Sequence, residues 1–186
     1  LNNSFRAYVN ANAHKITEFK SMVNQLNFNL FFQPIVDLKS REVSHFEMLC
    51  RFPGGGSPFE WIAFGEDLGM APDFDMAVFE RAVNYVAYKS SGRRTRFAVN
   101  ISGQSVQNKE FMEKLKDKLH KEKGAQGRIL FEITESSHIN DEMLERVNGH
   151  IHDLHALGYH ICLDDFGAGS ASFQYLQALD VDYVKI

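Results

Sequence analysis

Long hydrophobic runs are missing from this chain of 186 residues. No stretch approaches the roughly 18 consecutive apolar residues that a membrane-spanning helix needs. The N-terminal residues also lack the basic start and apolar core of a signal peptide. We therefore expect a cytoplasmic protein, or the cytosolic part of a larger membrane-anchored one, whose present segment makes no membrane contact.

Positive charge and cysteine are also scarce. The 20 basic and 24 acidic side chains give a net charge of −4. A nucleic-acid-binding surface needs a basic surplus, so we expect no nucleic-acid partner. The two cysteines, Cys50 and Cys162, are far apart and each lies in an apolar run. This predicts reduced, buried thiols rather than a disulfide or a metal pair.

The composition is that of a folded globular protein, with 44% hydrophobic and 24% charged residues. The length suits one domain with an appendage. The appendage is a predicted helix over residues 5–26 with a heptad seam that has one polar member, Asn12. Two interpretations stay open: a signalling helix that joins the domain to something upstream, or a helix packed on the body of the domain. We place the linker at 1–27 and the domain at 28–186.

The first two predicted strands form a hairpin. Residues 30–36 and 43–49 are apolar, and only a few residues separate them. A parallel crossover needs about a dozen residues, so this pair is predicted to be antiparallel. Residues 53–58 are rich in glycine and proline but lack the Gly-Lys-Ser/Thr ending of a phosphate-binding loop, so we expect an ordinary turn there.

Helices and strands alternate in the remainder of the chain. We expect strands at 97–101, 129–133, 159–163 and 181–186, and helices at 74–88, 108–121, 141–157 and 172–179. This alternation predicts an α/β fold in which helices cover a parallel sheet.

Polar residues interrupt the predicted strands in a consistent way. Parallel strands buried on both faces should be almost purely hydrophobic, yet successive strands carry Glu47, Asn100, Glu132, Asp164 with Asp165, and Lys185. Each could be an isolated helix cap or turn residue. In a barrel of parallel strands, however, such positions converge on one mouth, where the active site lies. We therefore favour one shared site.

The chemistry of this set points to a hard cation. Carboxylate and amide oxygens, with no Cys or His among them, suit Mg²⁺ or Mn²⁺ rather than zinc. Two such cations can activate a water and clamp a phosphodiester for in-line attack. Lys185 could hold that water, and Arg51, on the same strand face as Glu47, could bind a phosphate.

These residues resemble a known family. Glu47-Met48-Leu49-Cys50-Arg51 is similar to the Glu-Ala-Leu-x-Arg signature of EAL domains, phosphodiesterases that open cyclic di-GMP to linear pGpG. Other segments resemble the family in the same order, namely 32–35 (FQPI), 58–70, 99–102 (VNIS), 131–136 (FEITES), 164–172 (DDFGAGSAS) and 181–186 (VDYVKI). The resemblance runs from about residue 28 to the last residue and implies a TIM-like (β/α) barrel with a reversed first strand.

The resemblance also implies roles for single residues. It implies that Glu47, Asn100, Glu132 and Asp164 bind a first metal ion and Asp165 a second. Lys185 corresponds to the lysine that orients the attacking water, and Gln33, Leu49 and Arg51 to substrate contacts. Glu135 corresponds to the residue that steadies the loop at 165–172, which couples metal occupancy to dimerisation in the family. Met48, Ala168 and Ser170 depart from the family pattern without removing a ligand.

The end of the chain departs further from the family. A barrel of this kind runs to about 250 residues, whereas this sequence ends at Ile186 within the lysine strand. We therefore expect a barrel truncated after about six strands, a second metal site that is incomplete in this chain, and an uncertain activity of the chain itself. Open sheet edges at 30–36 and 181–186 predict self-association as a homodimer.

Two other patterns suggest different chemistry. Asp165-Phe166-Gly167 is also a kinase tripeptide, but the companion kinase motifs are absent from the sequence. His150, His152, His155 and His160 cluster in the sequence, but we expect a solvated helix face there rather than a zinc site, because a complete ligand set is lacking.

The leading hypothesis is thus a metal-dependent cyclic di-GMP phosphodiesterase that receives its signal from an upstream sensory domain. The alternatives are a non-catalytic receptor for the dinucleotide and a structural dimerisation module.

Overall fold

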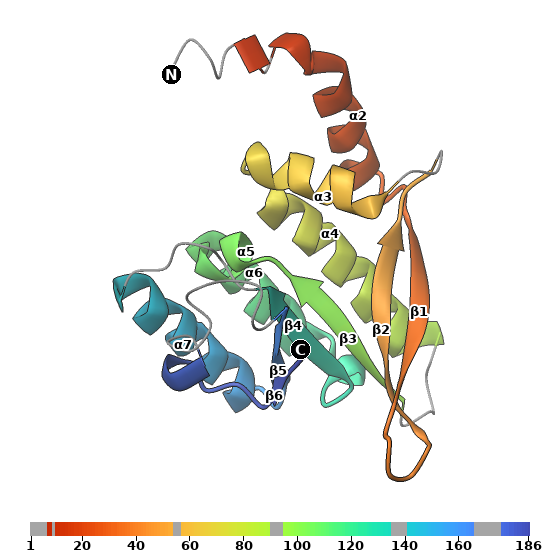
Figure 1. The fold of residues 1–186 in the computed structure, drawn as a ribbon, viewed down its shortest axis with the longest axis vertical. Coiled ribbons are helices and arrows are strands. Elements are labelled where there is room, and N and C mark those ends of the chain that lie inside the picture. Colours follow the sequence, from red (N-terminus) through yellow and green to blue (C-terminus); the bar gives the residue numbers. More distant parts are fainter. Residues whose placement is uncertain (1–6, 9, 54–56, 90–94, 135–140, 166–175) are drawn as a thin grey trace.

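A single mixed sheet organises the molecule. The computed structural model describes residues 7–8, 10–53, 57–89, 95–134, 141–165 and 176–186. Within these ranges six strands pair in chain order: β1 (Asn29–Val36), β2 (Val43–Arg51), β3 (Arg96–Ile101), β4 (Ile129–Thr134), β5 (His160–Asp164) and β6 (Tyr183–Val184). Figure 1 shows β1 and β2 as a long ribbon beside the shorter strands.

The first strand runs against the others. β1 pairs antiparallel with β2, and β2 to β6 pair in parallel. In the hairpin turn, Asp37 Oδ1 accepts the backbone N–H groups of Lys39 at 3.0 Å and Ser40 at 2.7 Å, and Arg41 adopts a left-handed conformation with φ of 63°. The predicted antiparallel hairpin and the predicted parallel sheet are both confirmed.

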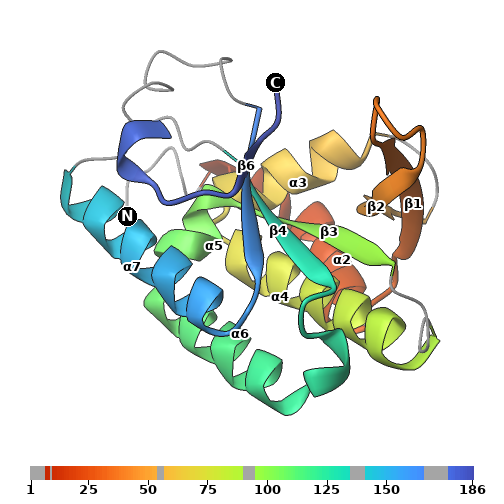
Figure 2. The same ribbon diagram turned by 90° about the horizontal axis from the view of Figure 1, so that it is seen from below.

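Three helices cover one face of the parallel strands. α4 (Ala71–Asn84), α6 (Lys109–Lys121) and α7 (Asp141–Ala156) lie side by side beneath β3, β4 and β5 in Figure 2. Short α5 (Gly103–Gln107) connects β3 to α6, while α2 (Ala13–Asn24) and α3 (Pro58–Asp67) pack at the end of α4. None of the helices in the described ranges is both long and apolar enough to cross a membrane.

Several element boundaries differ from the predictions. α4 ends at Asn84, and residues 85–89 form a π-helical turn instead of continuing the α-helix to 88. Strand β6 has two residues rather than six. α3 and α5 were not predicted, because α3 follows a turn-rich loop and α5 is too short to show a helical repeat.

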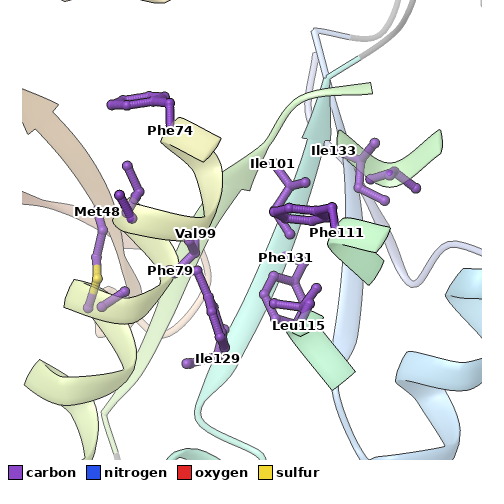
Figure 3. Close-up of a cluster of buried hydrophobic side chains, with 14 of the residues drawn as sticks. Met48, Phe74, Phe79, Val99, Ile101, Phe111, Leu115, Ile129, Phe131 and Ile133 are labelled. Atoms are coloured by element: carbon purple, nitrogen blue, oxygen red, sulfur yellow. The ribbon is translucent and has the colours of Figure 1, made fainter. Parts of the chain in front are cut away.

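The hydrophobic core lies between the sheet and the helices. Odd-numbered residues of β3 and β4 point into it, and Phe131 packs at ring distances of 6.0 Å from Phe79 and 5.7 Å from Tyr159. Figure 3 shows Val99, Ile129 and Phe131 on this face, with Phe111 and Leu115 of α6 beside them. The even-numbered residues of these strands therefore point to the opposite, inner face.

The N-terminal helix α2 is packed against the same core. Phe19 is fully buried, and its ring stacks on that of Trp61 with the two ring centroids 6.1 Å apart. Met22 and Val23 are also buried. The helix begins after Asn12, whose backbone N–H donates to the Tyr8 carbonyl. The described residues of α2 therefore pack on the domain, and a link from this segment to something upstream stays a prediction.

Candidate active site

Three buried carboxylates meet on the inner face of the sheet. Glu47 of β2, Glu132 of β4 and Asp164 of β5 are 7%, 2% and 8% exposed. Glu47 lies in the middle of β2, whereas Glu132 and Asp164 lie toward the C-terminal ends of β4 and β5. The parallel register brings the three together, because Glu47 pairs with Ala98, Asn100 with Glu132 and Thr134 with Asp164. One oxygen atom of each carboxylate lies within 4.8 Å of the others.

Lys185 occupies the centre of this cluster. Its Nζ atom lies 3.0 Å from Glu47 Oε2, 3.3 Å from Glu132 Oε2 and 3.1 Å from Asp164 Oδ2. The backbone N–H of Lys185 donates to the Leu163 carbonyl at 2.9 Å, which extends the pairing of β6 with β5 by one residue. The structure thus brings together four of the residues that the sequence predicted to share a site.

Asn100 and Asp165, the other two predicted metal ligands, lie at different positions relative to the cluster. Asn100 lies on β3, and its Nδ2 group donates to Glu47 Oε1 at 3.1 Å. Asp165 is exposed and has a left-handed φ of 55°. Its backbone N–H donates to Asp164 Oδ1 at 2.8 Å, so Asp165 is joined to the edge of the cluster.

The charges of the cluster perturb each other strongly. Burial, together with nearby Glu47, raises the pKa of Glu132, and the Lys185 ammonium opposes this rise. Burial alone would lower the pKa of Lys185, but the hydrogen bond to Glu47 and the charge of Glu132 outweigh it and raise this pKa. Three carboxylates in one buried place therefore require positive charge, which Lys185 supplies here.

The donor set fits a divalent cation. All three carboxylates can reach one ion, since their oxygens lie within 4.8 Å of one another. Oxygen donors without thiolate or imidazole suit Mg²⁺ or Mn²⁺. Within the described ranges, no other group of three or more His, Cys, Asp or Glu ligand atoms comes this close together.

A second group of predicted residues extends from the cluster along the hairpin. Gln33 pairs with Glu47, Phe31 with Leu49 and Asn29 with Arg51, so all six side chains share one strand face. Arg51 is half-buried, and its guanidinium lies 5.8 Å from the Phe31 ring. Phe31 is 56% exposed and was not predicted as a site residue. The face thus presents an amide, an exposed ring and a cation beside the carboxylates.

A cavity of about 260 Å³ borders the cluster toward the N-terminal ends of the strands. Glu132 and Lys185 form its boundary with the cluster, and Leu130, Cys162 and Arg96 lie among its other lining residues. Burial and the charge of Arg96 lower the pKa of His45, which also lines it. The inner face is therefore mixed apolar and basic on this side of the carboxylates.

Asp75 is a further buried carboxylate, which was not predicted as a site residue. It lies on α4, and its Oδ2 atom accepts the Ser102 backbone N–H at 2.8 Å and the Ser105 hydroxyl at 2.6 Å. Ser102 caps α5 directly after β3, the strand that carries Asn100. The signal was present, because Asp75 lies on the apolar stripe of α4 with Phe79 and Ala82.

The predicted solvated histidine face is correct only in part. His152 is exposed, but His150 is half-buried and burial lowers its pKa. His155 Nε2 and His160 Nδ1 each lie 2.9 Å from a carboxylate oxygen of Asp182. His155 on α7 and His160 on β5 thus have a common acidic partner that their spacing in the sequence did not reveal.

Two remaining predictions have different outcomes. Cys50 and Cys162 are free and buried, and burial raises the pKa of each thiol to about 12, as expected of unreactive thiols. Glu135, like most of the loop at 165–172, lies outside the described residues.

The sequence is similar to those of several known proteins. The family model described as "EAL domain" matches residues 17–186. The cyclic di-GMP phosphodiesterase PdeF of Escherichia coli K12 is 29% identical over 180 residues, which cover 92% of this chain and 24% of that protein. The cyclic di-GMP phosphodiesterase PdeA of Borreliella burgdorferi is 29% identical over 187 residues, covering 97% of this chain and 28% of that protein.

A solved structure shows the same fold. The EAL domain of FimX from Xanthomonas citri, determined in complex with c-diGMP, has a TM-score of 0.79 at 20% identity and covers 97% of this chain and 72% of that chain. The six-stranded, mostly parallel sheet with its helices is therefore part of a TIM-like α/β fold, as predicted. The chain spans about a quarter of the length of the two curated relatives.

Proposed function

The chain belongs to the EAL domain family, and we propose that it forms the catalytic part of a metal-dependent phosphodiesterase that hydrolyses cyclic di-GMP to linear pGpG. The observation that carries this proposal is the meeting of Glu47, Glu132 and Asp164 around one point beside Lys185. The names of PdeF and PdeA give the substrate class for these relatives.

In this proposal, Glu47, Asn100, Glu132 and Asp164 hold a first Mg²⁺ or Mn²⁺ ion, and Asp165 contributes to a second. When bound, such ions supply positive charge to the phosphate and lower the pKa of water. The buried carboxylates favour this binding because burial in a low-dielectric site makes unpaired negative charge costly. The hydrogen bond between Asn100 and Glu47 keeps one carboxylate oriented on the site.

Lys185 is proposed to hold the attacking water and to stabilise negative charge that develops on the phosphate. Its raised pKa keeps the side chain protonated, so it acts as a hydrogen-bond donor and cation rather than as a base. Its three carboxylate partners direct the ammonium into the cluster rather than toward solvent.

Substrate binding is assigned to the hairpin face. We propose that Arg51 contacts a phosphate, that Gln33 contacts substrate beside Glu47, and that Leu49 packs against the ligand. All three share a strand face with Glu47, which supports this assignment. The exposed Phe31 ring between Gln33 and Arg51 offers a surface for a planar base.

The test is a substitution that removes one charge from the cluster at nearly constant size. In the protein that carries this chain, Glu47→Gln should lower Mg²⁺-dependent formation of pGpG by at least about a hundredfold, because the substitution removes a negative charge that helps to hold the cation. Glu145→Gln, at an exposed position on α7, is the matched control and should leave turnover unchanged.

Turnover of Glu47→Gln within about tenfold of the unchanged protein would contradict the metal assignment, given what loss of a ligand costs. Binding of cyclic di-GMP by the unchanged protein without any pGpG would instead support a receptor, and absence of binding would leave only a structural module.

A further inference from the structure

Lys185 directly follows β6, the shortest strand of the described sheet. β6 has two residues, and Tyr183 and Val184 are 45% and 38% exposed. Its described pairing is with β5 alone, through Cys162 with Tyr183 and Leu163 with Val184. Just before the strand, Leu179 is buried and Val181 packs against the core, but apolar burial of Tyr183 and Val184 themselves is small. Polar contacts therefore supply much of the anchorage of residues 182–185.

The carboxylate of Asp182, immediately before β6, makes three hydrogen bonds. Oδ1 pairs with His160 Nδ1 at 2.9 Å, and Oδ2 pairs with His155 Nε2 at 2.9 Å and accepts the Ile161 backbone N–H at 2.8 Å. Burial would raise the pKa of Asp182, but these hydrogen bonds outweigh it and keep the pKa below its ordinary value. Asp182 is thus held as a carboxylate at a junction of α7, β5 and β6.

The backbone carries this anchorage to the active site. The Asp182 N–H donates to the Ile161 carbonyl at 2.9 Å, and three residues later the Lys185 N–H donates to the Leu163 carbonyl at 2.9 Å. The junction and Lys185 therefore share one short run of backbone. The centroid of the His160 ring also lies 6.1 Å from that of the Tyr183 ring, and Tyr183 lies between Asp182 and Lys185 in the chain.

This anchorage matters most when the carboxylates bind a cation. In the described structure, Glu47, Glu132 and Asp164 attract the Lys185 ammonium directly. A divalent ion on the same carboxylates would weaken that attraction and repel the ammonium, since like charges at short distance in a poorly solvated site repel strongly. Lys185 then needs a support that does not depend on the carboxylates.

We propose that Asp182, His155 and His160 form a clamp that holds residues 182–185 on β5 and so positions Lys185 when a cation occupies the cluster; this inference rests on the proposed function. The three are positioning residues, because none of them touches the carboxylate cluster. The histidines act as hydrogen-bond donors, and neutral or protonated rings can both fill that role.

The experiment compares two double variants in the protein that carries this chain. His155→Leu with His160→Leu removes both donors. His155→Gln with His160→Asn retains them, because the Gln amide nitrogen replaces Nε2 and the Asn amide nitrogen replaces Nδ1. His152→Leu, at an exposed position on α7, the helix that carries His155, controls for loss of a surface histidine.

Amide hydrogen exchange, measured with and without Mg²⁺, reports on the clamp directly. In the leucine pair with Mg²⁺, the Asp182 and Lys185 amides should exchange at least about tenfold faster, while the β3 amides remain unchanged, because local opening exposes only nearby groups. The Gln/Asn pair and His152→Leu should exchange like the unchanged protein. Equal protection in the leucine pair, or a uniform loss across the sheet, would overturn the proposal.

Kinetics supplies the second readout. In the leucine pair, kcat for cyclic di-GMP should fall at least about tenfold with KM within about twofold, the pattern expected when a group that acts in the transition state is misplaced. The Gln/Asn pair should recover kcat, and an undiminished kcat in the leucine pair would refute the clamp. If the unchanged protein has no activity, the proposed function fails, and the exchange measurement with Mg²⁺ still decides the clamp.

Discussion

Asp75 should make the stability of this fold depend on pH in a way that one substitution can isolate. The carboxylate is buried, and its hydrogen-bond partners are Ser102 and Ser105. No ion pair to Asp75 is found in the described part of the chain. Burial raises the pKa of Asp75 from 3.8 to about 6, against the opposing effect of the hydrogen bonds from Ser105 and Ser102.

The sign of the effect follows from this rise. The folded state holds the Asp75 proton more tightly than the unfolded state does, so the protonated group stabilises the fold. That contribution is fully present below about pH 4 and is lost as the pH rises through about 6. A rise from 3.8 to about 6 corresponds to about 3 kcal/mol in total, of which about 2 kcal/mol is lost between about pH 4 and pH 7.

The assay is urea unfolding followed by the fluorescence of the single tryptophan, Trp61, which lies in the aromatic cluster around Phe19. Asp75→Asn cannot titrate, so the unfolding free energy of the unchanged protein, relative to this variant, should fall by about 2 kcal/mol from about pH 4 to pH 7. A constant difference for Asp75→Asn would refute the reasoning, because it would mean that Asp75 keeps its ordinary pKa when folded.

Two further substitutions test the packing of α2 and the charge balance of the site. Gly65→Ala should destabilise the protein by about 1–3 kcal/mol in urea unfolding, because the new Cβ atom would lie 2.7 Å from the buried Phe19 ring. This clash should outweigh the better helix propensity of alanine. Unchanged stability would contradict close packing of α2 on α3. Lys185→Met should lower the free energy of unfolding by about 1–3 kcal/mol when divalent ions are chelated, because Glu47, Glu132 and Asp164 then lose the Lys185 ammonium. Added Mg²⁺ should reduce that loss, whereas the same loss with and without Mg²⁺ would argue against a cation site.

The order and direction of the strands could be predicted because they depend on short-range features of the sequence. The short link between residues 36 and 43 permits only an antiparallel hairpin, and helices between later strands require parallel pairing. The exact residues at which strands and helices begin and end were harder to predict. β6 is short although 181–186 is largely apolar, because strand pairing depends on a neighbouring backbone rather than on the strand's own pattern.

The convergence of the site could also be predicted, since strands that run in parallel end on the same side of a sheet. Asn100, Glu132 and Asp164 each interrupt an apolar strand at that end, and the register brings them together. The supporting contacts could not be predicted, because they join elements that lie far apart in the chain. Asp75 meets Ser102 across 27 positions, and His155 meets Asp182 across another 27. Only packing determines which of many polar residues make such contacts.

The charge of the inner face explains why one site can suit a lysine, a proton and a metal ion. Three buried carboxylates cannot all remain ionised without compensation, because each raises the proton affinity of the others. Lys185 compensates part of the charge, while burial and nearby Glu47 still raise the pKa of Glu132. A divalent cation would supply the remaining positive charge and release Lys185 to face substrate. The same imbalance that makes the cluster costly to bury therefore gives it affinity for a cation.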